Sequence, residues 1–245
     1  MVKWVEIGDC KLALGDCRDI LPTLGEVDAV VTDPPYGINY RHSGGGRWGG
    51  NGLTGKKKPL CDTRGVIGDD QPFDPAHLLA LAKKVILWGG NHYASRLPDQ
   101  PSWLVWDKVA TGPSFADVEM AWTNLGFPAK LHKQLWSGCL VSGEERTNRV
   151  MRETGRATRE HPTQKPVALM DWCVSLLGDP ATVLDPYMGS GTTGVVCARR
   201  SIAFVGIEID PTHFDIACRR IEEAYKQPRL FAEPVQKPVQ ETLGL

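Results

Sequence analysis

The segment Asp33-Pro34-Pro35-Tyr36 holds side chains suited to chemistry at an exocyclic amino group. It directly follows an apolar run that ends at Thr32. The two prolines remove two N–H donors and restrict the backbone, which leaves an acceptor-rich corner of the Asp33 carboxylate and the Pro34 carbonyl. This corner can accept both amino hydrogens while the Tyr36 ring stacks on the base, so that the nitrogen gains electron density and can attack an electrophilic methyl. A proline-rich turn with an Asp cap is the alternative, which the position after a buried strand disfavours.

A second motif, Leu184–Gly194, leaves an expected strand and opens a helix. Gly189 and Gly191 permit a tight turn and close approach of a ligand, and a helix N-terminus there favours a carboxylate or phosphate. No Lys follows the glycines, and Asp185 would repel a pyrophosphate but suits a cationic amino group. Glu208, nineteen residues after Gly189, suits ribose hydroxyls. A ligand with an amino acid at one end and a ribose at the other is S-adenosylmethionine.

Short apolar runs that alternate with amphipathic stretches must position these motifs. The runs predict strands over residues 27–32, 85–88, 103–106, 182–185 and 203–208, and helices starting at 74–76 and spanning 193–200 and 211–225. This alternation indicates a mostly parallel sheet covered on both faces. Loops at the carboxyl ends of neighbouring strands form one crevice, so Asp33 and Asp185 can line one site whichever comes first in the chain.

With these motifs the chain resembles the β class of amino-methylating DNA methyltransferases of bacteria and phages, in which D-P-P-Y precedes the G-x-G cofactor motif. The resemblance runs from about Leu12 to Phe231. It implies an α/β, Rossmann-like S-adenosylmethionine-dependent methyltransferase fold, with three α/β/α layers, a mostly parallel seven-stranded sheet and a permuted motif order. It further implies one methyltransferase domain over residues 1–231, DNA-facing insertions at 37–70 and 110–160, and an extended or disordered tail over 232–245.

The same resemblance assigns roles to the cofactor residues. Asp16 approaches the adenine of the cofactor, and Thr163 and Lys165 of the H-P-T-Q-K-P segment hold its carboxylate end, although Thr163 also suits a helix cap. Asp185 and Gly189 flank the methionine, and Glu208 binds the ribose. One departure is Tyr187, where many members have Phe, and it keeps the aromatic ring. The predicted cofactor-binding residues are Asp16, Asp33, Thr163, Lys165, Asp185, Pro186, Tyr187, Gly189, Ser190, Gly191, Thr192 and Glu208, and the predicted catalytic residues are Asp33, Pro34, Pro35 and Tyr36.

Two basic segments are expected to meet DNA, whose target base must be flipped out of the duplex. Residues 37–65, with nine glycines, carry a net charge of +5, and residues 129–166 carry +4, so the total of −1 conceals an acidic remainder. Arginines at steps of three or four from 146 to 159 would form one stripe on a helix, with a solvated helix face as the alternative. Trp48 would stack on or wedge into DNA, or anchor its loop. The predicted DNA contacts are Arg41, Arg47, Trp48, Lys56, Lys57, Lys58, Lys133, Arg146, Arg149, Arg152 and Arg156.

These features predict a site-specific methyltransferase that acts on an exocyclic amino group in double-stranded DNA. Within the resemblance D-P-P-Y favours adenine N6, with cytosine N4 as the alternative. Relatives that act on RNA or on protein glutamine more often read N-P-P-Y and place the cofactor motif first. A non-catalytic DNA-binding module is disfavoured by the intact Asp33, Tyr36, Asp185 and Glu208. No metal is expected, because the sulfonium of S-adenosylmethionine already carries an activated methyl.

Composition limits the remaining classes. The 245 residues are 42% hydrophobic and 23% charged, as in ordinary globular proteins. No apolar run approaches the roughly 20 residues that span a bilayer, so no membrane partner is expected, and the resemblance implies a cytoplasmic location in a bacterial cell or phage-infected host. The seven cysteines include no C-x-x-C pair, which favours free thiols. The resemblance leaves open a homodimer and a cognate restriction enzyme as further partners.

Overall fold

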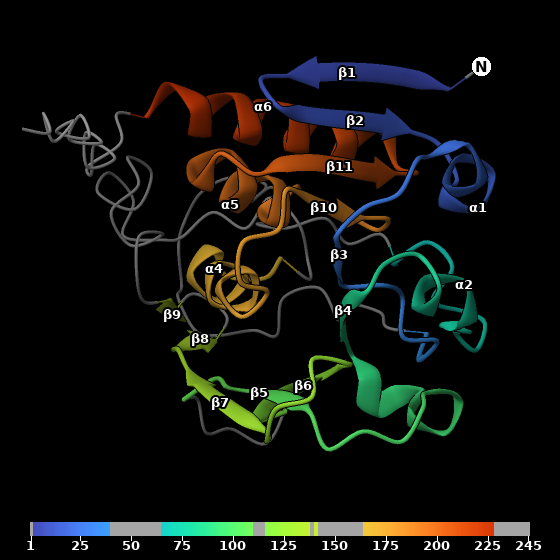
Figure 1. Ribbon diagram of the computed structural model, residues 1–245, viewed down its shortest axis with the longest axis vertical. Helices are drawn as coiled ribbons and strands as arrows, with labels where there is room; N and C mark the ends of the chain where they lie inside the picture. The colour runs from blue at the N-terminus through green and yellow to red at the C-terminus, as the bar shows by residue number, and fades with distance from the viewer. Residues whose placement is uncertain (1, 40–64, 110–115, 138–139, 142–163, 228–245) are drawn as a thin grey trace, which may run out of the picture.

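The structure is a computed structural model that describes five stretches of the chain (Figure 1). These are residues 2–39, 65–109, 116–137, 140–141 and 164–227. Within them, no helix combines the length and the apolar character needed to cross a membrane. The predicted tail over 232–245 and most of the segment 37–70 lie outside the described residues.

A nine-stranded, mostly parallel sheet forms the centre of the described structure. The strands are β1 Lys3–Ile7, β2 Cys10–Leu14, β3 Ala29–Thr32, β4 Lys84–Trp88, β5 Trp103–Asp107, β6 Val118–Thr123, β7 Lys130–Lys133, β10 Thr182–Asp185 and β11 Ala203–Glu208, with β8 Trp136–Ser137 and β9 Leu140–Val141 in a separate pair. Their order in the sheet is β1-β2-β11-β10-β3-β4-β6-β5-β7. Five neighbouring pairs are parallel, whereas β1–β2, β4–β6 and β6–β5 are antiparallel.

The central parallel strands are apolar along their whole length. All four residues of β3 are buried, as are Val85–Trp88 of β4 and Val183–Asp185 of β10. Near-continuous runs of this kind are typical of parallel strands that are covered on both faces. Because β3, β10 and β11 are parallel neighbours, their carboxyl ends meet at one edge of the sheet.

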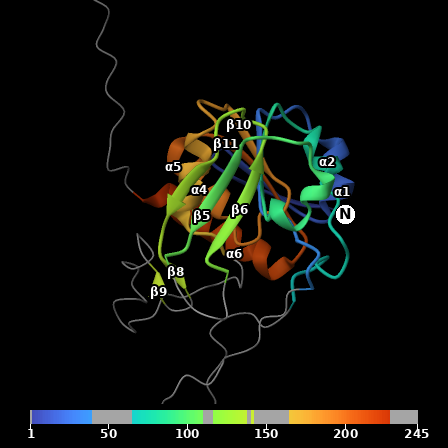
Figure 2. The same cartoon turned by 90° about the horizontal axis from the view of Figure 1, so that it is seen from below.

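Helices cover both faces of the sheet (Figure 2). On one face α4, α5 and α6 enclose a core that includes Leu169, Val196 and Phe214. On the other face α1 and α2 pack over a second core that includes Ile20 and Leu78. The helices are α1 Cys17–Ile20, α2 Ala76–Leu79, α4 Val167–Ser175, α5 Thr192–Arg200 and α6 Pro211–Lys226, with 3₁₀ turns η1 Leu21–Thr23, η2 Gly90–His92 and η3 Ala94–Arg96.

The start of α6 shows how the sequence fixes an element beside the site. Asp210 is the N-cap, and its carboxylate accepts hydrogen bonds from Thr212 N at 2.7 Å and His213 N at 3.1 Å. Pro211 occupies the first helical position, where its missing N–H has no helical partner to lose. The helix therefore begins three residues after β11 ends.

The described elements confirm the predicted three-layer α/β class and all five predicted strands. Two expectations need correction. The sheet has nine strands rather than the seven that the resemblance implies, because β1 pairs antiparallel with β2 at one edge and β7 is added at the other. The segment 110–160, predicted as an insertion, contains β6 and β7. β6 lies between β4 and β5 and buries Ala121 and Trp122, so it belongs to the core sheet.

Candidate active site

The two sequence motifs meet at the carboxyl ends of β3 and β10. Asp33 follows β3 and Asp185 ends β10, and the two strands are parallel neighbours. Both carboxylates line one small pocket, together with Lys165, Gly189 and Thr193. The remaining lining residues are Gln164, Met170, Tyr187, Met188, Ser190 and Thr192. The fold therefore brings the acceptor corner and the glycine turn together.

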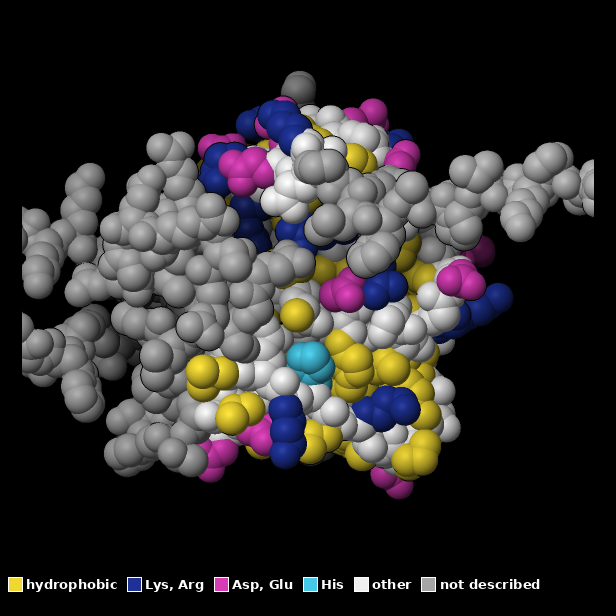
Figure 3. Space-filling view, turned by 90° about the vertical axis from the view of Figure 1, so that its left-hand side faces the viewer, with side chains coloured by type: hydrophobic (Ala, Val, Ile, Leu, Met, Phe, Trp, Pro, Cys, Tyr) yellow, Lys and Arg dark blue, Asp and Glu magenta, His cyan; other side chains and the backbone are white. Residues whose placement is uncertain are grey.

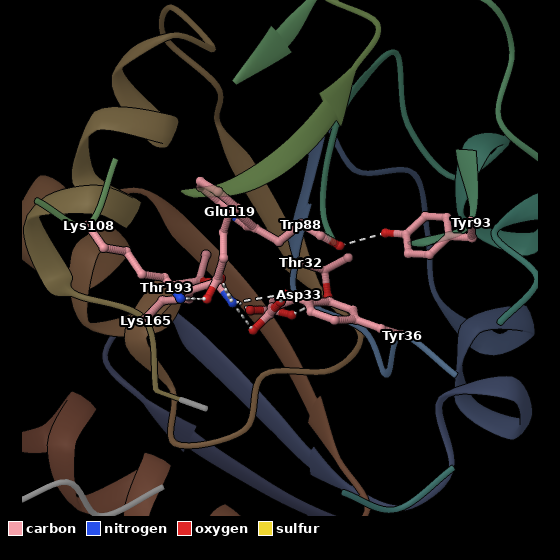
Figure 4. Close-up of polar contacts among 10 residues, drawn as sticks. Thr32, Asp33, Tyr36, Trp88, Tyr93, Lys108, Glu119, Lys165 and Thr193 are labelled. Carbon is pink, nitrogen blue, oxygen red and sulfur yellow. Dashed lines mark hydrogen bonds and ion pairs between the residues drawn. The ribbon is translucent and has the colours of Figure 1, made fainter. Parts of the chain in front are cut away.

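The acceptor corner is built around Asp33 and Tyr36. The Tyr36 hydroxyl donates to Asp33 Oδ1 at 2.6 Å (Figure 4). The Tyr36 ring stacks on His92 with centroids 4.9 Å apart and planes 14° from parallel. Its edge lies against Gly89, whose φ of +73° is a left-handed conformation that favours glycine. Gly89 and His92 were not among the predicted site residues, and the structure places both against Tyr36.

Lys165 lies in the acceptor corner. Its Nζ is 2.6 Å from Asp33 Oδ2, 3.1 Å from Tyr36 Oη and 3.0 Å from Glu119 Oε2 (Figure 4). The ammonium also faces the rings of Tyr36 and Trp88, each with its centroid at 5.7 Å. The side chain predicted to hold the cofactor carboxylate thus pairs with Asp33, the predicted catalytic aspartate, and it also lines the shared pocket. Its predicted companion Thr163 lies outside the described residues.

The charges around this ammonium shift one another's pKa values. Burial raises the pKa of Asp33, and the nearby Lys165 opposes that rise. Burial alone would lower the pKa of Lys165, but the carboxylates of Asp33 and Glu119 raise it above its usual range. Burial would likewise raise the pKa of Glu119, but Lys165 and Lys108 lower it to about 2. Asp33, Glu119 and Lys165 are therefore arranged as alternating charges.

Asp185 is held by hydroxyl groups. Thr32 Oγ1 donates to one carboxylate oxygen at 2.6 Å, and Thr193 Oγ1 donates to the other at 2.7 Å. The backbone N–H of Tyr187 donates to the first oxygen at 3.2 Å. Burial raises the pKa of Asp185 to about 6, and these hydrogen bonds oppose the rise. The strand tip therefore holds a fixed carboxylate that faces Asp33 across the pocket.

The glycine turn is tied to β11 through Glu208. One oxygen of its carboxylate accepts the Gly189 N–H at 2.9 Å, and the other accepts the Asp210 N–H at 2.7 Å. Burial raises the pKa of Glu208 to about 7, against these two hydrogen bonds. Gly191, at φ +77°, lets the turn pack on Ala217 of α6, where an added Cβ would lie 2.8 Å from the Ala217 side chain. Glu208, which was predicted to bind the ribose, thus also fixes the glycine turn.

Arg220 of α6 is a supporting residue that sequence reasoning missed. Its Nη1 donates to Ser190 O at 2.5 Å, to Ser190 Oγ at 2.9 Å and to Thr192 Oγ1 at 3.2 Å. The helical spacing of α6 could have shown that Arg220 lies about one turn after Ala217, but not that it reaches the glycine turn. It links α6 to the predicted cofactor residues.

Asp16 lies beside the same edge of the sheet. The Gly15 N–H donates to Glu208 O at 2.9 Å, which joins the end of β2 to the end of β11. The Asp16 carboxylate caps α1 through Arg18 N at 2.9 Å and pairs with the Arg18 guanidinium. These bonds lower its pKa, the contact with Arg18 being the main cause. The structure therefore places Asp16 near Glu208 but with its charge already paired.

The predicted DNA contacts fall almost entirely outside the described residues. Lys133 is the exception, and it is exposed at the end of the edge strand β7. Over the face shown in Figure 3, basic, acidic and apolar side chains of the described residues are interspersed. Among the described residues, no group of three or more His, Cys, Asp or Glu side chains is placed to hold a metal ion. The contacts assigned to Arg41, Arg47, Trp48, Lys56, Lys57, Lys58, Arg146, Arg149, Arg152 and Arg156 stay predictions.

Solved structures with a similar fold include two DNA methyltransferases. The fold matches the M1.HpyAVI–SAM complex with a TM-score of 0.50 and 22% identity, covering 86% of this chain and 99% of that one. It also matches PvuII DNA methyltransferase (cytosine-N4-specific) with a TM-score of 0.53 and 15% identity, covering 91% and 95%. The chain thus shares the fold of these two structures, which confirms the predicted Rossmann-like α/β class.

The sequence comparison is more specific. Residues 104–219 match the N6/N4 DNA methylase family model, a range that contains the glycine turn and Lys165 but not Asp33. Type II methyltransferase M2.DpnII of Streptococcus pneumoniae is 36% identical over 94 residues, covering 38% of this chain and 31% of that protein. Type II methyltransferase M.HinfI of Haemophilus influenzae is 34% identical over 100 residues, covering 40% and 26%. The chain thus matches a quarter to a third of the length of these relatives, and within residues 104–219 it is similar to N6/N4 DNA methylases.

Proposed function

We propose that this chain transfers a methyl group from S-adenosylmethionine to the exocyclic amino group of a flipped base in double-stranded DNA, with adenine N6 as the target. One observation carries the proposal. Asp33, Asp185 and Glu208 lie at the carboxyl ends of three neighbouring parallel strands. In open α/β sheets this edge is where ligands bind.

The cofactor half of the site suits S-adenosylmethionine. Asp185 and Glu208 are almost fully buried, and each carboxylate is fixed by at least two hydrogen bonds. Glu208 would hold the ribose hydroxyls, Asp185 would face the methionine amino group, and Asp16 would approach the adenine. When bound, S-adenosylmethionine supplies a methyl on a positively charged sulfur. A nitrogen lone pair can attack this methyl carbon, and the sulfur then leaves as a neutral thioether. The residues present fit both ends of this group.

The acceptor half prepares the nitrogen. The Asp33 carboxylate and the Pro34 carbonyl would accept the two amino hydrogens, which withdraws the nitrogen lone pair from the base ring and directs it at the methyl. Tyr36 would stack on the base, and His92 backs one face of its ring. Once the new N–C bond has formed, the nitrogen releases one proton, for which Asp33 is the nearest carboxylate. General acid–base groups of this kind typically contribute about 10²- to 10⁴-fold in rate.

DNA supplies the target base, which must leave the stack to reach this corner. Flipping costs a few kcal/mol, which contacts to the phosphate backbone offset. We propose that these contacts come from the two basic segments, residues 37–65 and residues 129–166, the second of which includes Lys133. A cytoplasmic location and a homodimer, which would extend the DNA-facing surface, are part of the same proposal.

Methyl transfer tests the proposal directly. Protein, tritiated S-adenosylmethionine and unmethylated mixed-sequence DNA are combined, and label in DNA is counted for the intact chain and for Asp33→Ala. The intact chain should label the DNA and the variant should not, while both bind the cofactor. Hydrolysis to nucleosides then separates N6-methyladenine from N4-methylcytosine. Label that appears only on cytosine would replace the adenine assignment, and no label with the intact chain would refute the function.

A further inference from the structure

A line of four buried or half-buried charges leads away from the acceptor corner. Lys108 follows β5 and pairs with Glu119 Oε1 of β6 at 2.5 Å. Glu119 Oε2 lies 3.0 Å from Lys165 Nζ, which lies 2.6 Å from Asp33 Oδ2 (Figure 4). The signs alternate along the line, and it ends on the catalytic carboxylate.

The sheet explains why Glu119 is available to Lys165. β5 and β6 are antiparallel, with Trp106 opposite Glu119, and the Lys108 N–H donates to Asp117 O at 3.0 Å. Lys108 is therefore the diagonal neighbour of Glu119 on one face of the ribbon, within reach of a long side chain. Only 15% of the Lys108 side chain and 25% of the Glu119 side chain are exposed. Both charges are therefore largely withdrawn from solvent.

Charge balance alone does not require this second pair. Asp33 and Lys165 already neutralise each other, and burying further ions costs several kcal/mol per ion unless they are well paired. What Glu119 adds is a second counter-ion for an ammonium that would otherwise belong to Asp33 alone. The ammonium donates hydrogen bonds to Asp33 Oδ2 and Tyr36 Oη, and Glu119 Oε2 lies 3.0 Å from it as an ion-pair partner without a hydrogen bond.

We propose that Glu119 is a positioning residue that shares the Lys165 ammonium with Asp33, and that this sharing keeps Asp33 available to accept the hydrogens of the target amino group. Without Glu119, Lys165 would pair with Asp33 alone and occupy the acceptor that the amino group needs. With Glu119 in place, Lys165 can lean toward Glu119 as the amino group arrives, and its charge never becomes unpaired. The inference rests on the function proposed above.

The pH dependence of methyl transfer tests the sharing. Titratable and charged groups face Asp33 from several elements: Lys165 before α4, Glu119 of β6, Lys108 after β5, Asp185 of β10, and Tyr36 and Tyr93. Glu119→Gln removes a negative charge and leaves Lys165 to Asp33. The acid limb of kcat/KM should therefore move to lower pH by about one unit. The plateau kcat should fall about threefold to tenfold, because a less basic carboxylate is a weaker acceptor.

Lys108→Met should move the acid limb in the opposite direction. Glu119 then loses its other cation and draws Lys165 more strongly away from Asp33, so the limb should move to higher pH. Glu223→Gln, which removes one carboxylate of the exposed Arg219 ion pair on α6, is the matched control and should leave the profile unchanged. Opposite shifts of this kind would not follow from general loss of structure.

The outcomes separate this inference from the proposed function. Absence of methyl transfer by the intact chain refutes the function. A second outcome refutes only the sharing of Lys165. In that outcome the intact chain transfers methyl groups, but the acid limbs of Glu119→Gln and Lys108→Met either coincide with that of the intact chain or both move in the same direction. Should Glu119→Gln fail to fold, the direction of the Lys108→Met shift decides. Glu119→Asp, which keeps a carboxylate at this position, should have an acid limb close to that of the intact chain.

Discussion

Gly89 controls where the Tyr36 ring can lie, and Gly89→Ala is the sharpest geometric perturbation that the site offers. An added Cβ would lie 2.0 Å from Tyr36 Cε1 and 2.2 Å from Cδ1. Carbon atoms pack best at about 3.5–4.0 Å, so the ring or the backbone must move by roughly 1.5 Å. The ring is held by its hydroxyl bond to Asp33 and its stack on His92, so a shift disturbs the acceptor corner directly.

The expected magnitude has two parts. A non-glycine residue at φ +73° costs about 1–2 kcal/mol in stability. A misplacement of about 1 Å in a catalytic geometry can cost about 10²-fold in rate, so kcat should fall by about a hundredfold. The cofactor residues Asp185 and Glu208 lie on other strands, so the dissociation constant for S-adenosylmethionine should change by less than about twofold.

Gly126→Ala is the matched control for this experiment. Gly126 has φ +74°, nearly that of Gly89, and an added Cβ there meets no atom within 4 Å. Both variants should lose stability in urea denaturation through the backbone strain, and Gly89→Ala should lose more because of its clash with Tyr36. Only Gly89→Ala should lose methyl transfer, measured as initial rates with tritiated cofactor. Equal rates for the two variants, both near that of the intact chain, would show that Tyr36 placement does not limit the reaction and would refute the reasoning.

Three further predictions concern the cofactor half of the site. Ribose hydroxyls donate best to an ionised Glu208, and burial raises the pKa of Glu208 to about 7. Cofactor affinity, measured by calorimetry, should therefore rise about tenfold from pH 6 to pH 8. An affinity that does not change with pH would contradict this prediction. Thr193→Val removes a donor to buried Asp185 and should lower the unfolding free energy by about 1–3 kcal/mol at pH 8. The loss should be smaller at pH 5, below the Asp185 pKa of about 6, and equal losses at both pH values would count against it. Arg220→Met frees the glycine turn and should weaken cofactor binding about tenfold by calorimetry, whereas unchanged binding would show that the turn holds itself.

The strands that sequence reasoning found are those with strong local patterns. Val85–Trp88 is a continuous apolar run, and Val183–Leu184 is a short apolar run that ends at Asp185; such runs identify buried parallel strands. β6 was hidden because Glu119 interrupts its apolar pattern, although Ala121 and Trp122 are buried. Its place between β4 and β5 is a property of the whole sheet, which no local window contains.

The site shows the same division. The motifs located Asp33, Asp185 and Glu208, because parallel strands bring their carboxyl ends together whatever the chain order. The ion pairs that Lys165 makes with Asp33 and Glu119 were not predicted, because Glu119 comes from a strand that the sequence did not reveal, and the cofactor role of Lys165 stays a prediction. Long side chains choose among partners by geometry, which motif spacing does not specify.

The backbone itself sets the separation between the two halves of the site. β3 and β10 are adjacent parallel strands with Val30 opposite Leu184, and such strands lie about 4.8 Å apart. Thr32 donates to Asp185, while the next residue, Asp33, carries the acceptor carboxylate. One residue step at the end of β3 thus separates the side chain that fixes the proposed cofactor half from the side chain that receives the proposed target. The permuted order of the motifs leaves this spacing intact, because it depends on strand neighbours and not on which strand comes first.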